Sequence, residues 1–229
     1  MGRLIGILIC LYLCSQYFMF VCSSILAVKC MDGIILAYDS AEKSVQSLSM
    51  SNPWVEKVFP VTSNTVICSA CSCSGNEGAD FKEFLREIRE EVFDYKLTEA
   101  NVINVETESM LGLESIYFLA KKLIRHKYPS IHIFITGFCG DSRTDKNSFK
   151  LFEVLPGGTG IEGENLLVAG SGGVNIVSLL SDILLSESSI TVQKAIPKVK
   201  RALSTATKLD HGSGGRPVLW TLARPSTAS

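Results

Sequence analysis

Side chains that could take part in nucleophilic or acid–base chemistry stand at the ends of apolar runs and in glycine-rich turns. Asp39 ends the run GIILAYD, Ser171 lies in Gly-Ser-Gly-Gly, and Asp210 and Ser213 lie in DHGSGG. Lys57 has apolar neighbours in the run VEKVF, which favours a partly buried lysine over a solvated one. Taken singly, such a serine is an ordinary turn residue and such an aspartate is a cap. They become candidates for one site only if the fold brings them together.

Three cysteines, Cys68, Cys71 and Cys73, are close enough in the chain to suggest a metal site. Tetrahedral zinc needs a fourth ligand, and no paired CxxC or HxxxH motif follows. We therefore expect reduced thiols on a strand and its turn, with no metal and no other cofactor. Reduced thiols are typical of a cytosolic or nuclear protein.

The composition indicates one globular domain without a strongly charged partner. At 229 residues the chain is within the length of a single domain. Lys and Arg number 22 against 23 Asp and Glu, a formal charge of −1. This balance gives no electrostatic reason to expect nucleic acid or an anionic membrane as a partner.

Residues 4–22 form an uncharged apolar run that follows Arg3, LIGILICLYLCSQYFMFVC. Such a run suggests a secretory signal or a marginal membrane span, but it lacks a small-x-small cleavage site. We interpret it as an atypical propeptide or as a mis-predicted first exon, in which case the codon of residue 23 could encode threonine. The expected organisation is an N-terminal extension over 1–22, one domain over 23–223 and a polar tail over 224–229.

The order of predicted elements is strands, two helices, strands, two helices and a final strand. Two hairpins of short apolar or β-branched runs are expected first, over residues 24–39 and over 55–61 with 64–70. Apolar residues at three-and-four spacing predict amphipathic helices over 79–96 and about 109–128. A further strand pair is expected over 131–138 and 149–155.

The last part of the chain predicts two more helices. An apolar helix follows Gly173 and extends to about Leu185, and we expect its residues to be ordinary core. Thr191 is expected to cap a basic helix that extends to about Lys208, with Pro197 either kinking it or marking its true start. Residues 216–223 close the domain as a strand. Two sheets, each carrying a helix pair, would bury their apolar faces in a four-layer α-β-β-α sandwich, an α/β fold of two antiparallel sheets.

The run SSILAVKCMDGIILAYDS resembles the opening hairpin of proteasome core particle β-type subunits, which have the N-terminal nucleophile hydrolase fold. The resemblance extends over nearly everything from Ser23 onward. It implies the following candidate catalytic residues: Ser23 at the nucleophile position, Asp39, Lys57, and the orienting residues Ser171, Asp210 and Ser213. In this family the free α-amine of the first residue activates its own hydroxyl. An ammonium at Lys57 would favour loss of the hydroxyl proton, and Asp39 would hold the lysine.

Three departures from the family pattern bear on activity. The nucleophile position holds serine, which lacks the methyl group that restricts the threonine side chain. Cys22 precedes it, where self-maturing members have glycine, whose backbone freedom suits the turn used in self-cleavage. The glycine that donates its N–H to the oxyanion aligns near Cys71, or near Gly75 if the loop is shifted.

Two functions are compatible with these residues. The favoured hypothesis is a threonine-type endopeptidase subunit that hydrolyses unfolded or ubiquitin-tagged proteins. The alternative is a non-catalytic structural β subunit of the same ring. A bacterial two-component relative is disfavoured by the closing DHGSGG. The resemblance implies a hetero-oligomer with other α and β subunits in stacked heptameric rings, located in cytoplasm and nucleus. The resemblance places the specificity pocket near Ser69, which offers no basic group to attract acidic side chains.

Overall fold

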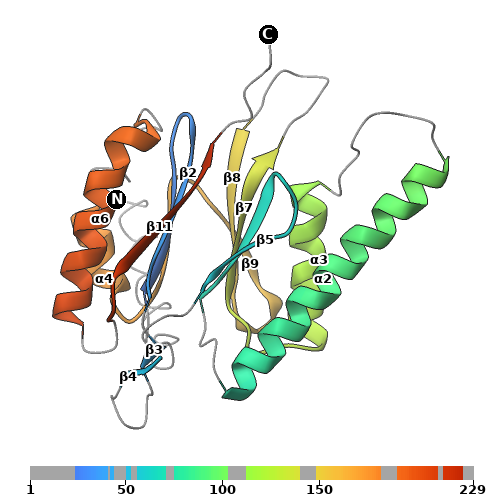
Figure 1. The fold of residues 1–229 in the computed structure, drawn as a ribbon, viewed down its shortest axis with the longest axis horizontal. Helices are drawn as coiled ribbons and strands as arrows, with labels where there is room; N and C mark the ends of the chain where they lie inside the picture. The colour runs from blue at the N-terminus through green and yellow to red at the C-terminus, as the bar shows by residue number, and fades with distance from the viewer. Residues whose placement is uncertain are drawn as a thin grey trace, which may run out of the picture.

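Two β-sheets face each other in the structure, and helices cover the outer face of each sheet (Figure 1). The computed structural model describes residues 24–40, 42–43, 50–52, 56–70, 75–102, 112–139, 148–181, 190–210 and 214–223. The predicted four-layer α-β-β-α sandwich is confirmed. Among the described residues, no helix combines the length and the apolar character that crossing a membrane requires. The apolar run 4–22 lies outside the described residues.

The first sheet has four antiparallel strands in the order β10-β1-β2-β11. Their bounds are β10 Leu166–Gly170, β1 Ser24–Lys29, β2 Gly33–Asp39 and β11 Pro217–Ala223. Successive side chains of a strand point to opposite faces, and here both faces of the central strands are covered. Ile25 therefore packs between the sheets while Leu26 packs under the helices. This explains why β1 and β2 are continuous apolar runs without polar alternation.

The second sheet has five antiparallel strands in the order β5-β6-β7-β8-β9. Their bounds are β5 Val58–Pro60, β6 Thr65–Ser69, β7 Ile133–Cys139, β8 Ser148–Val154 and β9 Gly160–Gly163. A separate small pair is formed by β3 Glu42–Lys43 and β4 Met50–Asn52. The core between the two large sheets includes Phe134, Phe149 and Leu151 from the second sheet.

Within the described parts of the chain, two helices cover each sheet. The first sheet carries α4 Gly173–Leu179 and α6 Val192–Leu209, and the second carries α2 Gly75–Val102 and α3 Leu113–His126. The predicted apolar face of α2 is buried, as Phe84 and Ile88 are both 0% exposed. This helix is longer than the predicted 79–96, because the adjoining residues contain no proline that would stop it.

The helix predicted to extend to about Leu185 ends earlier than expected. Helix α4 ends at Leu179, where the N–H of Leu180 bonds to the carbonyls of both Ile176 and Val177 and tightens the last turn. Residues 182–189 lie outside the described residues. Ile176 is buried as core, but Val174 is 62% exposed, so the expectation that this helix is all core is wrong at Val174.

Helix α6 begins with a cap that the sequence did not indicate. Thr191 occupies the N-cap position, but its side chain makes no capping hydrogen bond. The N–H of Val192 instead donates to Oδ1 of Asp32, 2.8 Å away in the β1–β2 turn. The helix continues through Pro197, so the prediction that this proline could mark its start is wrong. Packing of Ala195, Val199 and other small residues on the first sheet supports the helix around the proline.

Strands β9 and β10 were not predicted. The sequence GIEG of β9 has an exposed and half-buried pattern without apolar alternation. Strand β10 pairs with β1, and Ser24 lies opposite Gly170. This pairing joins two distant parts of the chain. A short window of sequence therefore predicts neither strand, because β9 lacks a strand pattern and β10 depends on a distant partner.

Candidate active site

Lys57 and Asp39 form a buried ion pair that joins the two sheets. Asp39 is the last residue of β2, and Lys57 directly precedes β5. The ammonium Nζ of Lys57 lies 2.7 Å from Oδ1 of Asp39 and 2.8 Å from the carbonyl oxygen of the same residue. The two side chains are 2% and 0% exposed, respectively. The reading of Lys57 as a solvated surface charge is therefore wrong, and a buried lysine is confirmed.

The Asp39 carboxylate accepts hydrogen bonds on both oxygens. Oδ1 accepts from Lys57 and from the backbone N–H of Ser24 at 3.1 Å, and Oδ2 accepts from the N–H of Gly214 at 3.1 Å. Burial raises the pKa of the Asp39 carboxyl above its ordinary value, while Lys57 and the two amides act in the opposite direction. Asp39 thus binds Lys57, the start of β1 and Gly214, which follows the predicted site residue Ser213 in the chain.

Ser171 and Asp210 form the second hydrogen-bonded pair. The hydroxyl of Ser171 donates a hydrogen bond to Oδ2 of Asp210. Ser171 lies in the turn between β10 and α4, and Asp210 is the C-terminal cap of α6. Gly170, with a φ of 98°, adopts a backbone conformation that L side chains disfavour and so allows this turn. The structure therefore brings together the predicted Ser171 and Asp210 from separate helix ends.

Ser24 lies between these two pairs. Its backbone N–H donates to Asp39, and its Oγ accepts a hydrogen bond from the N–H of Gly172 at 3.2 Å. Ser24 is 0% exposed. Ser23, the predicted nucleophile, lies outside the described residues, and its peptide bond to Ser24 includes the nitrogen that donates to Asp39.

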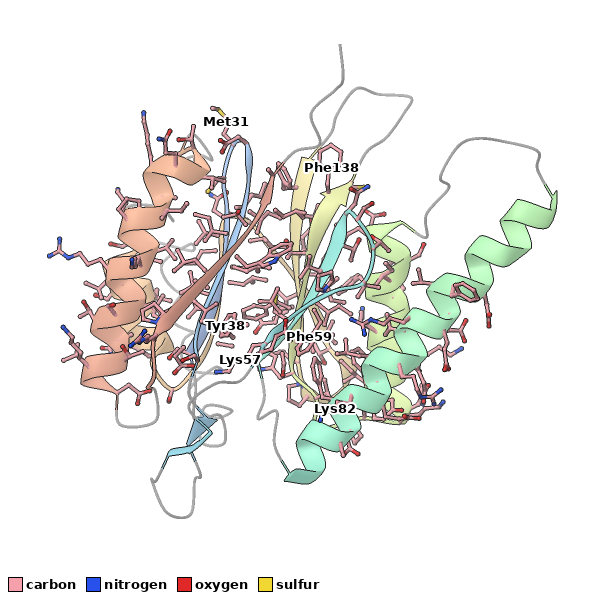
Figure 2. The ribbon with its side chains drawn as sticks, viewed as in Figure 1. Met31, Tyr38, Lys57, Phe59, Lys82 and Phe138 are labelled. Carbon is pink, nitrogen blue, oxygen red and sulfur yellow. The ribbon has the colours of Figure 1, made fainter. Side chains whose placement is uncertain are left out.

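The pair of Lys57 and Asp39 lies toward one end of the sandwich. Figure 2 shows Lys57 and Tyr38 between the two sheets, while Met31, in the β1–β2 turn, lies at the opposite end. The Nζ of Lys57 is 5.8 Å from the centre of the Tyr38 ring. An aromatic face attracts a cation, and the contact adds to the restraint on the lysine.

Some predicted site residues lie outside the described residues. These are Ser23, Ser213 and Cys71. The alternative oxyanion residue, Gly75, is the first residue of α2. Of the suggested metal-binding cysteines only Cys68 is described, and it is a buried thiol whose pKa burial raises.

Two features of this arrangement are of the kind that assists an amine-activated hydroxyl. A buried ammonium near a hydroxyl stabilises the alkoxide form, and the same ammonium disfavours a second positive charge on a neighbouring amine. A hydroxyl hydrogen-bonded to a carboxylate, as in Ser171 and Asp210, can orient such an amine, in the manner of the third member of a triad. The described residues therefore supply a charged group and an orienting group on either side of Ser24.

The fold is a four-layer sandwich with a cluster of buried polar side chains at one end of its sheets (Figure 2). The family model for proteasome subunits matches residues 19–222, and the chain belongs to this family. The two antiparallel sheets with their helices are consistent with the N-terminal nucleophile fold of the proteasome. Family membership implies assembly with other proteasome subunits in rings. A comparison with the curated proteins gave no match.

Sequence reasoning missed the residues that connect the site through the backbone. Ser24, Gly172 and Gly214 all contribute hydrogen bonds, yet none of them was a candidate. One signal was available for Ser24, which is the only hydroxyl residue in the otherwise apolar or basic strand SILAVK. The amides of Gly172 and Gly214 have no sequence signature, since any residue except proline offers an N–H.

Proposed function

We propose that the chain is a β-type proteasome subunit that hydrolyses peptide bonds through an N-terminal hydroxyl at position 23. The observation that carries the proposal is the buried Lys57–Asp39 pair, whose carboxylate also binds the backbone N–H of Ser24 at 3.1 Å. Burying an ammonium and a carboxylate is costly, and a hydrophobic pair of similar volume is often as stable. Catalysis by a neighbouring hydroxyl gives a reason for a buried ion pair at this place.

In the proposed reaction, cleavage before residue 23 exposes a free α-amine, whose ordinary pKa is about 7.7–8.0. This amine removes the proton of the residue's own hydroxyl as the hydroxyl oxygen attacks the scissile carbonyl, and it passes that proton to the leaving amine when the peptide C–N bond breaks. Water then hydrolyses the resulting ester, which releases the second product and restores the hydroxyl. Lys57 favours the ionised hydroxyl, and Asp39 fixes the lysine by two contacts, 2.7 and 2.8 Å long. Ser171, Asp210 and Ser213 orient the amine. A backbone N–H near Cys71 or Gly75 stabilises the oxyanion, a contribution of about 2.7–4 kcal/mol in comparable sites.

The proposed substrates are unfolded or ubiquitin-tagged polypeptides, and the proposed partners are the other α and β subunits in stacked heptameric rings. The same proposal includes a location in cytoplasm and nucleus. The mature first residue is Ser23 in this sequence. If the first exon is mis-predicted, the codon of residue 23 could encode threonine instead. Both residues carry the hydroxyl that the reaction needs.

A second candidate function is a structural β subunit without turnover. The specific observation that favours it is Cys22-Ser23, in place of the Gly-Thr of members that mature by self-cleavage. Such a subunit would occupy its ring position with residue 23 still blocked by the preceding chain.

The test is covalent labelling of the full chain within assembled particles. A mechanism-based inhibitor that reacts with an N-terminal nucleophile is added, and the labelled peptide is identified by mass spectrometry. We expect the label on residue 23, together with cleavage of a fluorogenic peptide. Ser23→Ala should abolish the label and lower turnover by more than about a thousandfold. An assembled, mature particle in which this chain takes no label would contradict the catalytic proposal and support the structural subunit.

The control for this test is Thr136→Val, which removes a buried hydroxyl in the second sheet. Thr136 donates to the carbonyl of Lys150 at 3.0 Å and belongs to β7. Its loss should cost stability without changing the label on residue 23.

A further inference from the structure

Ser24 makes hydrogen bonds toward both pairs of the candidate site. Its N–H donates to the same Asp39 oxygen that binds Lys57, and its Oγ accepts from Gly172, the residue directly after Ser171. Completely buried hydroxyls are hydrogen-bonded in nearly all proteins, because an unpaired one is costly. A serine in this position of an apolar strand therefore indicates a specific requirement for its oxygen.

The hydrogen bond from the Gly172 N–H to Ser24 connects Ser24 to the turn that contains Ser171. Gly172 is the N-cap residue of α4, and its carbonyl accepts the N–H of Ile176 at 3.1 Å. Ser24 is also paired with Gly170 in the sheet, on the other side of Ser171 in the chain. Both neighbours of Ser171 are thus held by one residue of β1. These two restraints lie on either side of Ser171, whose hydroxyl donates to Asp210.

We infer that Ser24 is a positioning residue that fixes the Ser171–Asp210 pair relative to the Lys57–Asp39 pair. This inference rests on the proposed function, because the relative position of the two pairs matters only to a hydroxyl and amine located between them. Ser24 contacts no substrate in this role. It acts through the turn that holds Ser171 and through the carboxylate of Asp39.

The two hydrogen bonds of Ser24 can be separated experimentally. The bond from its N–H to Asp39 is made by the backbone and is retained by other residues, whereas the bond to Gly172 requires a side-chain oxygen. Ser24→Thr and Ser24→Val provide a matched pair, since threonine and valine have nearly the same shape and only threonine has the hydroxyl. Any effect of the added methyl group is common to both variants. Ser24→Ala is a third variant, for use if the branched residues do not fold.

The first readout is amide hydrogen exchange of a peptide that contains Gly172, measured by mass spectrometry on the full chain in assembled particles. The bond from Gly172 to Ser24 should be lost in Ser24→Val and kept in Ser24→Thr. We expect the Gly172 amide to exchange about three- to tenfold faster in the valine variant. Thr136→Val, which loses a comparable hydrogen bond in the other sheet, should leave this exchange unchanged.

The second readout is turnover of a fluorogenic peptide. We expect kcat of Ser24→Val to fall about ten- to hundredfold with KM unchanged, because misplacing a catalytic group slows the reaction without weakening substrate binding. Ser24→Thr should restore kcat. A residue with a merely structural role would lower stability in the way that Thr136→Val does, with no change in kcat.

Equal exchange at Gly172 in the threonine and valine variants would overturn the inference, as would equal kcat in two active variants. The proposed function fails separately, if wild-type particles take no label on residue 23. In that case turnover plays no part, and the exchange comparison alone decides whether Ser24 holds the turn of Ser171.

Discussion

At the scale of single residues, the Lys57–Asp39 pair connects the fold to the proposed chemistry. Both charges are almost fully removed from water, and each depends on the other for compensation. The position of Lys57 beside apolar residues made its burial predictable. Its partner was implied only by the resemblance, because Asp39 is 18 residues away in the chain. The bond from Ser24 to Gly172 spans 148 residues and could not be predicted from local sequence.

Lys57→Met tests the strength of this pair. The variant leaves the Asp39 carboxylate buried without its positive partner, and we expect it to lose about 3–5 kcal/mol of the free energy of unfolding at pH 7. Urea denaturation of the full chain measures this loss. The double variant Asp39→Asn with Lys57→Met should be more stable than Lys57→Met alone, since no charge remains buried. A single variant that loses less than about 1 kcal/mol would contradict the pairing.

The same variant should have a characteristic pH dependence. Burial raises the pKa of Asp39 in the folded state, and Lys57 opposes that rise, so its removal should raise the pKa of Asp39 further. A carboxyl whose pKa is higher in the folded than in the unfolded protein stabilises the fold below the unfolded value and loses that effect as pH rises through the folded value. The deficit of Lys57→Met should therefore shrink as pH is lowered from 7 toward about 4. A deficit that is constant over this range would be inconsistent with a buried, ionised Asp39.

At the scale of elements, helix and strand types were predictable where apolar periodicity was strong. The buried face of α2 followed directly from its spacing, and the hairpin of β1 and β2 followed from two apolar runs around Asp32. Ends of helices were less predictable, because they depend on contacts from elsewhere in the chain. The cap of α6 comes from the β1–β2 turn, 160 residues earlier.

Asp32 and Thr191 allow the cap of α6 to be tested. Asp32→Ala removes the acceptor of the Val192 N–H and should lower the free energy of unfolding by about 0.5–2 kcal/mol. Thr191→Ala removes no capping hydrogen bond, and its effect should be smaller than that of Asp32→Ala. Thermal or urea unfolding of the two variants makes the comparison. A larger loss of stability in Thr191→Ala would show that Thr191 caps the helix, as the sequence predicted.

The turn before β9 contains a second matched pair, Gly157 and Gly158. Their φ angles are 80° and 82°, so alanine at either position should cost about 1–2 kcal/mol through backbone strain. A Cβ at Gly157 would meet nothing within 4 Å, whereas one at Gly158 would lie 2.7 Å from the carbonyl oxygen of Lys121 in α3. Gly158→Ala should therefore cost about 1–3 kcal/mol more than Gly157→Ala. Equal stability of the two variants would mean that the turn does not pack closely on α3.

At the scale of the whole molecule, the sandwich was predictable because each apolar face needs a covering layer. The first sheet buries one face under α4 and α6 and the other against the second sheet, so the order of elements along the chain already favoured this arrangement. Pairing of β10 with β1 was not predictable, since it depends on which distant segment completes the sheet edge. That pairing is nevertheless what brings the turn of Ser171 beside Ser24.

The candidate site was also predictable in part: its residue types were, and the contacts between distant segments were not. The residue types of Asp39, Lys57, Ser171 and Asp210 were recognisable in the sequence, and the structure joins them in two pairs. The hydrogen bonds that relate one pair to the other come from backbone amides and from Ser24. Their positions depend on the completed sandwich, and no local pattern encodes them.

The most direct test of the proposed function is the identity of the first residue of the mature chain in assembled particles. Mass spectrometry of its N-terminal peptide should find residue 23 in first place with a free α-amine, followed by SILAVK. Such a terminus puts an amine and a hydroxyl on the residue that adjoins the Ser24 N–H bound to Asp39. A mature chain that retains residues before position 23, or that begins after it, would contradict catalysis by this subunit.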